Sequence, residues 1–281
     1  MWIPSAGPSA NITGVDVEPS RGDRAEEYAR GLERYRKSVA SLPFDLSASP
    51  SRIEHQFECL SDWSLFHTVD EVRDWFLDRR RHCGMRIEDI PLKDARGWTI
   101  DPETGNVTHE SGEFFSVHGI RVTESAGREV GARGWDQPIL EQIGYDGGLL
   151  GILRKRFLGV PHYLIEAKAE PGNYEILQLS PTLQATFSNL RRAHKGRKPR
   201  FAQFFEEPES NEATVLYRQW LSEDGGRLHK KRNMGMLVEV PEAHQIPVPE
   251  GFVWLSMYQI KALLEENALV NPHIRGIIAH L

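Results

Sequence analysis

The stretch HYLIEAKAEPGNYEILQLSPTLQATFSN, residues 162–189, contains the most informative pattern of predicted secondary structure in the chain. Its opening HYLIEAKA and the later YEILQL are enriched in the β-branched, aromatic and apolar side chains that are typical of β-strands. The run between them contains Pro, Gly and Asn, which favour turns. The stretch therefore predicts two strands joined by a polar turn.

A helix is predicted directly after these strands. Ser180 is a good helix N-cap, and Pro181 suits the first helical position. The apolar side chains that follow recur at helical spacing, at Leu183, Phe187 and Leu190. We therefore expect a helix over residues 183–194.

More strands are predicted on both sides of this stretch. GWTI and NVTHE flank the turn sequence DPETG at 101–105, so a hairpin is expected there. The segments EFFSVHGIRV, VLYRQW and GMLVEV have strand composition as well. Together these segments indicate a mixed sheet in the middle of the chain.

Helices are predicted towards both ends. Tyr28, Leu32, Tyr35 and Val39 form one apolar stripe over 24–39. Capping boxes begin two further helices, and an Asn-Pro pair begins a last one, at Thr68/Glu71, Ser256/Gln259 and Asn271-Pro272. We expect an α+β fold, with a tail and helix over 1–40 and one domain over 41–281.

Composition and charge argue against several classes of protein. The 281 residues carry 34 Lys and Arg against 40 Asp and Glu, a net charge of −6, which argues against nucleic-acid binding. No apolar run is long enough for a membrane span, and the first twenty or so residues lack a signal-peptide pattern. Two cysteines cannot build a disulfide framework, so a reduced cytoplasm is expected.

Local chemistry leaves several alternatives open. Lys168 and Glu170 share one face of a strand, as a surface ion pair or as an acid/base pair at the strand end. Ser180 either caps its helix or, with Thr182, belongs to an anion site at the helix N-terminus. The basic run at 191–200 is either a solvated helix end or a patch facing a diphosphate.

Other signals are weaker. Trp135 and Trp220 are either core or base-stacking residues. The histidines at positions 109, 118, 162 and 194 show no metal-ligand spacing. No Walker loop, GxGxxG, HExxH or CxxC motif is present.

Several segments, taken in order, resemble the NDP-hexose 2,3-dehydratase family of deoxysugar biosynthesis. They are GWTIDPETGNVTHESGEFFSVHGIRV, GWDQPILEQ, GVPHYLIEAKAEPGNYEILQLSPTLQATFSN, SEDGGRLHKKRN and WLSMYQIKALLEENALVNPHIRGIIAHL. The resemblance covers about residues 65–281. It implies a Nudix-like fold, with a mixed sheet between helices, that binds a nucleoside-diphosphate sugar.

The resemblance also implies an assembly and a cofactor requirement. Typical members carry two tandem copies of this module and form dimers, whereas this sequence holds one copy. A homodimer is therefore expected, with a symmetric interface in place of the intramolecular one. Residues 172–194 contain only Glu175 as a carboxylate, so a magnesium-dependent Nudix hydrolase is not expected. No cofactor or metal is expected.

The implied reaction acts on an NDP-4-keto-6-deoxyhexose. Removal of the proton on carbon 3 gives an enolate that expels the 2-hydroxyl, and the enol relaxes to a 3,4-diketo sugar. The resemblance places Glu170 as base or acid, with Lys168 or His162 stabilising the enolate or protonating the leaving group. The residues expected to bind substrate are Trp135, Gln137, Gln178, Thr182, Gln184, Asn189, Arg191, Lys231 and Arg232.

Four positions depart from the family pattern. Phe187 and Leu190 replace the Arg and Tyr of QATRSNY, and Met234 and Gly235 replace the Arg and Asn of KRNRNM. Two alternatives follow: a non-catalytic module that binds nucleotide sugars, or a dehydratase that acts on a different keto substrate.

Overall fold

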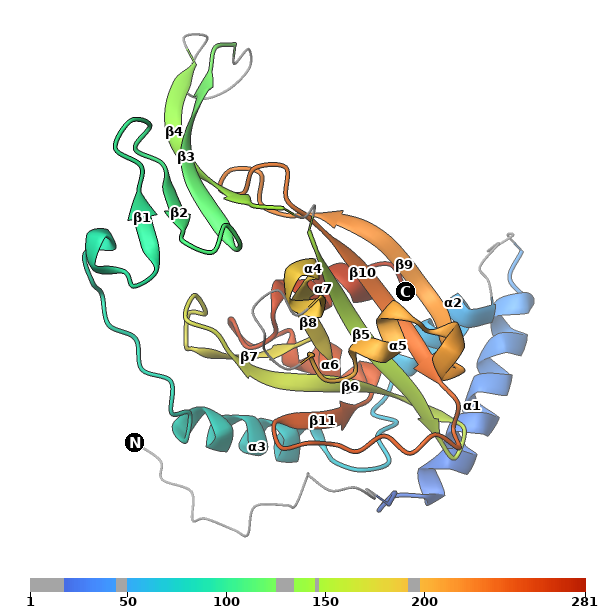
Figure 1. Ribbon diagram of the computed structural model, residues 1–281. Helices are drawn as coiled ribbons and strands as arrows, with labels where there is room; N and C mark the ends of the chain where they lie inside the picture. Colours follow the sequence, from blue (N-terminus) through green and yellow to red (C-terminus); the bar gives the residue numbers. More distant parts are fainter. Residues whose placement is uncertain (1–17, 44–49, 125–133, 145–146, 192–197) are drawn as a thin grey trace.

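The computed structural model describes residues 18–43, 50–124, 134–144, 147–191 and 198–281. A mixed seven-stranded sheet forms its centre, with the path β11-β6-β5-β10-β9 (Figure 1). Strands β5 and β10 are parallel, and the other pairs are antiparallel. The strands of this sheet are β5 (Gly148–Phe157), β6 (Val160–Ala169), β7 (Leu177–Ser180), β8 (Leu183–Thr186), β9 (Thr214–Ser222), β10 (Arg232–Val240) and β11 (Phe252–Leu255).

The sheet divides between β5 and β6. The two strands pair from Leu153 and Leu164 to the turn that joins them, and then separate. Beyond that point β8 pairs with β5, and β7 pairs with β6. Thr182, between β7 and β8, lies at the fork: its hydroxyl accepts from the Leu153 amide at 2.8 Å and donates to the Leu164 carbonyl. The fork divides this end of the sheet into two halves, one ending in β8 and the other in β7.

The predicted helix over 183–194 is wrong. Residues 183–186 form strand β8, because their backbone groups pair with Gly148–Gly151 of β5. In the described part of the range, up to residue 191, the short helix α4 (Phe187–Leu190) follows, and Thr186 caps it; residues 192–194 lie outside the described residues. Ser180 ends strand β7 and caps no helix. Strand pairing over a long sequence distance therefore overrides the helical spacing of the apolar residues.

A smaller four-stranded sheet projects from the body as an arm (Figure 1). It is a meander, so the hairpin expected around 101–105 is confirmed. The end of β4 joins the body, where Leu140 pairs with Leu228. The strands of the arm are β1 (Trp98–Ile100), β2 (Val107–His109), β3 (Phe115–Val122) and β4 (Trp135–Gln142), and the short helix η1 (Leu92–Asp94) precedes them.

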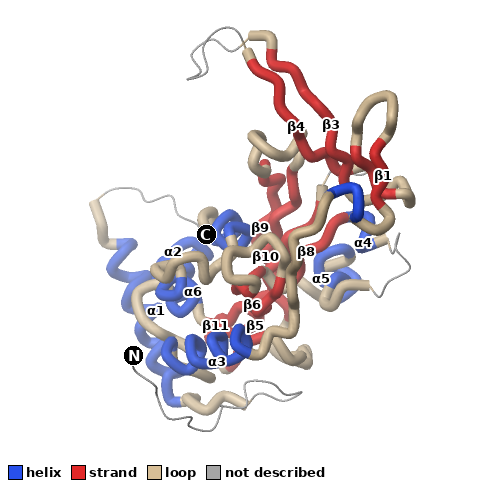
Figure 2. Tube along the Cα trace, turned by 90° about the vertical axis from the view of Figure 1, so that its left-hand side faces the viewer, coloured by secondary structure: helices blue, strands red, loops and turns tan. Residues whose placement is uncertain are grey.

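Helices cover both faces of the main sheet, as Figure 2 shows, which confirms the α+β class with a mixed sheet between helices. Core side chains of α3, α6 and α7 pack on one face, and those of α5 pack on the other. Helices α1 and α2 pack together around Tyr28 and Phe57. The remaining bounds are α1 (Asp23–Ala40), α2 (Pro50–Glu58), α3 (Val69–Arg81), α5 (Ala202–Glu206), η2 (Glu209–Asn211), α6 (Met257–Leu263) and α7 (Pro272–Ile278).

Three of the predicted helix starts are confirmed. Both capping boxes form, at Thr68/Glu71 and at Ser256/Gln259. Asn271 caps α7, with Pro272 at the first helical position. These signals hold because each cap is a contact within four residues, so no distant strand competes for it.

A buried ion network fixes α2 to the sheet. The guanidinium of Arg154, on β5, contacts Glu58 of α2 at 2.9 Å and also pairs with Glu239 of β10. The side chains of Arg154 and Glu58 are 3% and 2% exposed. A second pair, Arg156 and Glu54, lies beside it at 2.8 Å. Because each buried charge has a partner, the network avoids the cost of an isolated buried ion.

Two buried histidines predict a loss of stability in acid. Burial lowers the pKa of His55 to about 4 and that of His162 to about 3. Below pH 6.5 the unfolded chain binds a proton that the folded chain excludes, so stability falls as the pH decreases towards these values. Each histidine accounts for about 3 kcal/mol between pH 7 and pH 4.

Urea unfolding of the wild type and of His55→Gln at both pH values measures this. The variant is expected to lose less stability in acid by about 3 kcal/mol. His82→Gln, at an exposed position, is the control and should behave as the wild type. Equal pH slopes for wild type and His55→Gln would contradict the assignment.

Candidate functional site

The predicted pair of Lys168 and Glu170 lies at the fork in the sheet. The Lys168 Nζ is 3.4 Å from Glu170 Oε1 and donates to the Gln184 carbonyl at 3.3 Å. The Gln184 amide, on β8, donates to both oxygens of Glu170, at 3.1 and 3.3 Å. Side chains from the two separated halves of the sheet are therefore held together here.

A second group of polar side chains comes from the strands beside β5. Glu223 follows β9, and its carboxylate accepts from Asn233 of β10. The imidazole Nδ1 of His273, in the first turn of α7, is 3.7 Å from Glu223 Oε1. Lys231 precedes β10 and donates to Gln142 at the base of the arm.

Backbone pairing brings the two groups close together, because Lys168 pairs with Gln178 of β7 and the Asn271 amide, at the start of α7, donates to the Leu179 carbonyl of β7 at 2.8 Å. Burial lowers the pKa of His273, the carboxylates of Glu223 and Glu170 act to raise it, and the ammonium groups of Lys168 and Lys231 act to lower it. Burial also lowers the pKa of Lys231. We name the set the fork cluster: Lys168, Glu170, Gln184, Glu223, Lys231, Asn233 and His273.

The fork cluster is accessible without being fully solvated. The side chains of Lys168 and Glu170 are 24% and 32% exposed, and those of His273 and Glu223 are 24% and 21% exposed. Gly147, with φ +145°, immediately precedes β5 and lies so close to β10 that a Cβ would be 2.0 Å from the Arg232 carbonyl oxygen. A glycine is therefore required where the two strands meet at this site.

Four of the residues expected from the sequence belong to the fork cluster: Lys168, Glu170, Gln184 and Lys231. Two more lie close in the sheet but serve the fold. The Thr182 hydroxyl is 2% exposed and is occupied at the fork. The Gln178 amide is buried and donates to the Ala268 carbonyl at 2.8 Å.

The structure does not bring His162 to this site. It lies on β6 at 0% exposure, six residues before Lys168. Its Nε2 accepts from the Leu65 amide at 3.1 Å, and its Nδ1 contacts the Val160 carbonyl at 3.1 Å. Both ring nitrogens therefore hold the chain in place.

Three further expected residues are exposed on the surface. Asn189 and Arg191 belong to α4 and its C-cap. Arg232 lies over the ring of Trp220, 4.4 Å from its centroid, and Trp220 is 38% exposed. Because side chains alternate along a strand, Arg232 and Asn233 point to opposite faces of β10.

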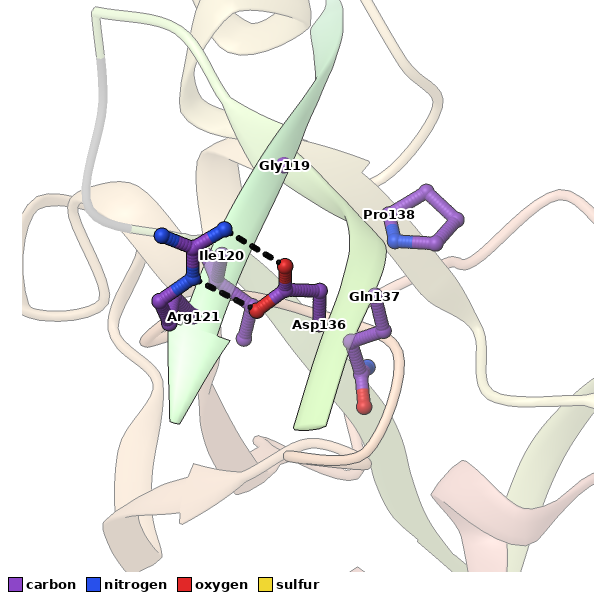
Figure 3. A pocket seen from close by; sticks show the side chains of 6 residues that line it. All are labelled: Gly119, Ile120, Arg121, Asp136, Gln137 and Pro138. Carbon is purple, nitrogen blue, oxygen red and sulfur yellow. Dashed lines mark hydrogen bonds and ion pairs between the residues drawn. The ribbon is translucent and has the colours of Figure 1, made fainter. Parts of the chain in front are cut away.

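Trp135 and Gln137 lie on the arm instead. The indole N–H of Trp135 donates to Gln137 at 2.7 Å, and Gln137 donates to the Gly226 carbonyl at 2.8 Å. The same strand borders a groove of about 500 Å³, which Figure 3 shows with the exposed Arg121–Asp136 pair. This groove contains no residue of the fork cluster.

Neither alternative for Ser180, a helix cap or part of an anion site at a helix N-terminus, is correct, because no helix begins at Ser180. The Ser180 side chain is fully buried, and its hydroxyl has no hydrogen-bond partner among the described residues. Most of the basic run at 191–200, and His194, fall in 192–197, outside the described residues. Within the described part of the run, Lys198 pairs with Glu206 at 2.7 Å.

Sequence reasoning missed His273, Glu223 and Asn233. The sequence gives only a weak indication that these residues are functional, because each lies where a strand or helix begins or ends. His273 follows the Asn-Pro pair that starts the last helix. A polar residue at such a boundary has the appearance of ordinary surface until the fold places several of them together.

The four departures from the family pattern lie in or against the core. Leu190 is buried, and Phe187 and Met234 pack against the core on the α5 face. Gly235 is buried, and a Cβ there would be 2.7 Å from the end of the Leu221 side chain, which would have to move. The departures therefore alter packing and leave the fork cluster complete.

The described residues show neither a metal-binding group of side chains nor a membrane-spanning helix. They contain no group of three or more His, Cys, Asp or Glu side chains placed to hold a metal ion. Within the same residues, no helix has the length and apolar character to cross a membrane.

The chain is similar to two kinds of solved hydrolase. One, titled an ADP compounds hydrolase, matches with a TM-score of 0.34 and 14% identity, over 58% of this chain and 82% of that chain. An Ap4A hydrolase from C. elegans, in a binary complex, matches with a TM-score of 0.27 and 10% identity, over 49% of this chain and 100% of that chain. TM-scores this low carry no functional argument.

Curated relatives are more similar in sequence. A dTDP-4-dehydro-6-deoxy-alpha-D-glucopyranose 2,3-dehydratase from Streptomyces violaceoruber is 40% identical, over 79% of this chain and 47% of that protein. Proteins of the same name from Amycolatopsis orientalis and Saccharopolyspora spinosa are 37% and 39% identical, over 76% and 74% of this chain and 44% and 41% of those proteins. The chain thus spans about half the length of the curated relatives it matches.

The family model described as NDP-hexose 2,3-dehydratase matches residues 69–281, which include the whole fork cluster. The chain therefore belongs to the NDP-hexose 2,3-dehydratase family.

Proposed function

We propose that this chain eliminates the 2-hydroxyl of a nucleoside-diphosphate 4-keto-6-deoxyhexose, with a dTDP-linked sugar as substrate, to give a 3,4-diketo sugar. The fork cluster carries this proposal. It places an ammonium group, carboxylates and an imidazole together, partly shielded from water. Those are the groups that an elimination next to a ketone requires.

Lys168 has the central role. Loss of the proton on carbon 3 moves negative charge onto the ketone oxygen, and a fixed ammonium donor stabilises that charge. Glu170 and Gln184 hold the amine in place. Glu170 is also placed to exchange a proton with the sugar, as base or acid. Lys231, which contacts Gln142 at the base of the arm, would bind the diphosphate.

The proposal includes no metal and no redox cofactor, because the reaction neither oxidises the sugar nor transfers a hydride. The substrate assay should therefore run at full rate in the presence of a chelator.

We also propose the expected cytoplasmic location, which fractionation of the producing cells would test.

The direct test is incubation with dTDP-4-keto-6-deoxyglucose and a ketoreductase that traps the product. The proposed function predicts a trapped sugar that has lost one water and its 2-hydroxyl. Binding without any loss of water would instead favour a binding module that lacks the chemistry. Release of a nucleoside monophosphate that requires magnesium would favour a hydrolase.

We also propose that the chain forms a homodimer, and that the segment from α3 to β1 contributes to the interface. This extended segment exposes apolar side chains that a monomer rarely leaves in water, at Met85, Ile87, Ile90, Leu92 and Ile100. The exposed fractions of Ile87 and Ile90 are 52% and 54%.

Replacing Ile87 and Ile90 together by Asp should weaken the dimer about 10⁴-fold, because a symmetric dimer contains two copies of each side chain and each copy loses roughly 1.5 kcal/mol of apolar burial. Light scattering coupled to gel filtration measures the mass at several concentrations. Leu158→Asp, at an exposed turn between β5 and β6, is the matched control. A wild type that is monomeric at all concentrations would refute the homodimer.

A further inference from the structure

His273 is a titratable group in the fork cluster for which the sequence predicts no role. Its imidazole is partly exposed and lies 3.7 Å from Glu223. Apart from that near contact, its ring makes no hydrogen bond to the described residues. An imidazole with one nitrogen beside a carboxylate is the usual arrangement of a base that accepts a proton on its other nitrogen.

Glu223 is itself fixed. Asn233 donates to its Oε1, and the Glu223 amide donates to the Lys231 carbonyl at 3.0 Å. The separation of 3.7 Å is longer than a hydrogen bond, but catalytic contacts of this kind commonly shorten when substrate binds. A carboxylate at Nδ1 keeps the proton on that nitrogen and leaves the lone pair on Nε2.

We propose that His273 is a catalytic residue that takes the proton from carbon 3, and that Glu223 is its positioning residue. This inference rests on the proposed function. It divides the work between two neighbouring groups: His273 receives the proton, and the Lys168–Glu170 pair stabilises the enolate and protonates the departing hydroxyl.

Proton transfer from carbon 3 precedes the loss of the 2-hydroxyl. The C3–H bond breaks, its proton moves to Nε2 of neutral His273, and its electron pair forms a C3–C4 double bond with the charge on the ketone oxygen. That charge then returns to re-form the C4 carbonyl, a C2–C3 double bond forms, and the C2–O bond breaks. The hydroxyl leaves as water with a proton from Lys168. His273 afterwards releases its proton to solvent, and Lys168 regains one from solvent.

The surroundings of His273 agree with this role. The charged groups that face it are Glu223 after β9, Lys231 before β10, and Lys168 and Glu170 on β6. Burial and the two lysines keep the imidazole neutral, as a base must be, and Glu223 stabilises the imidazolium once it forms.

The test compares His273→Ala, Glu223→Gln, Glu223→Asp and the control His82→Gln, whose imidazole is 76% exposed on α3. We expect His273→Ala to lower kcat ~10²–10⁴-fold with substrate affinity nearly unchanged. Added imidazole should restore part of the rate. Glu223→Gln should shift the acid limb of the pH–kcat profile, and Glu223→Asp should restore it in part. His82→Gln should match the wild type.

The outcomes separate the two claims. A wild type that does not dehydrate the sugar refutes the proposed function, and the assignment of His273 with it. An active wild type refutes only the assignment if His273→Ala stays within about threefold of its kcat. The assignment is equally overturned if imidazole gives no rescue and the acid limb persists unchanged in a folded His273→Ala that binds substrate.

Discussion

Lys168→Met is expected to lower kcat for dehydration by ~10²–10³-fold, because one donor to a developing oxyanion is worth about that much. Methionine keeps the length and most of the volume of the side chain but removes the charge. The Lys168 ammonium is held in place by Glu170 and by the Gln184 carbonyl, so the donor is already positioned when the charge develops. Steady-state kinetics with the trapped product give kcat.

The control for this substitution is Lys37→Met. Lys37 is 74% exposed on α1 and makes a surface pair with Glu33. Its loss should leave kcat unchanged, since exposed pairs contribute little. Activity within a few-fold of wild type for a folded Lys168→Met would show that the ketone oxygen is stabilised elsewhere.

Arg154→Leu is expected to destabilise the fold by ~3–5 kcal/mol. The substitution leaves Glu58, 2% exposed, and Glu239 without their shared partner beneath α2. Glu58 then loses its buried ion-pair partner, whereas Glu239, 22% exposed, keeps its contact with Arg156 at 3.5 Å. Denaturant unfolding followed by circular dichroism measures the loss.

Arg30→Leu provides the comparison. Arg30 pairs with Glu26 on the surface of α1, and its side chain is 64% exposed. This change should cost less than about 1 kcal/mol. Equal losses for both variants would mean that the buried network does not hold α2 to the sheet.

The sequence predicts features of this fold that depend on near neighbours. The caps at Thr68, Ser256 and Asn271 and the hairpin at 101–105 involve residues a few positions apart, and the structure has all of them. The α+β class follows from the same local patterns.

Predictions failed where the structure depends on pairing between distant parts of the chain: one predicted element was wrong, and another element was not predicted. The spacing of Leu183, Phe187 and Leu190 fits a helix, but β5 supplies a strand partner that only the folded chain provides. Strand β5 itself was not predicted, because Arg154 and Lys155 interrupt its apolar run. Their burial depends on distant partners, Glu58 for Arg154 and the His244 carbonyl for Lys155.

The candidate site likewise combines residues that the local sequence predicts with residues that only the fold brings together. Lys168, Glu170 and Gln184 lie in one continuous stretch, so the sequence predicts them together. His273 is more than one hundred positions away from Glu170, and Glu223 follows a different strand, so only the fork in the sheet relates them. Trp135 and Gln137 lie on the arm, because β4 carries them away from the fork.

A crystal structure of Lys168→Met with dTDP-4-keto-6-deoxyglucose bound tests most directly whether the fork in the sheet is where the sugar reacts. We predict that carbons 2 to 4 of the sugar lie at the fork between β6 and β8, with carbon 3 next to His273 and the ketone oxygen facing the space left by the amine. A sugar bound on the arm, in the groove beside Arg121 and Asp136, with the fork filled only by water, would contradict this account.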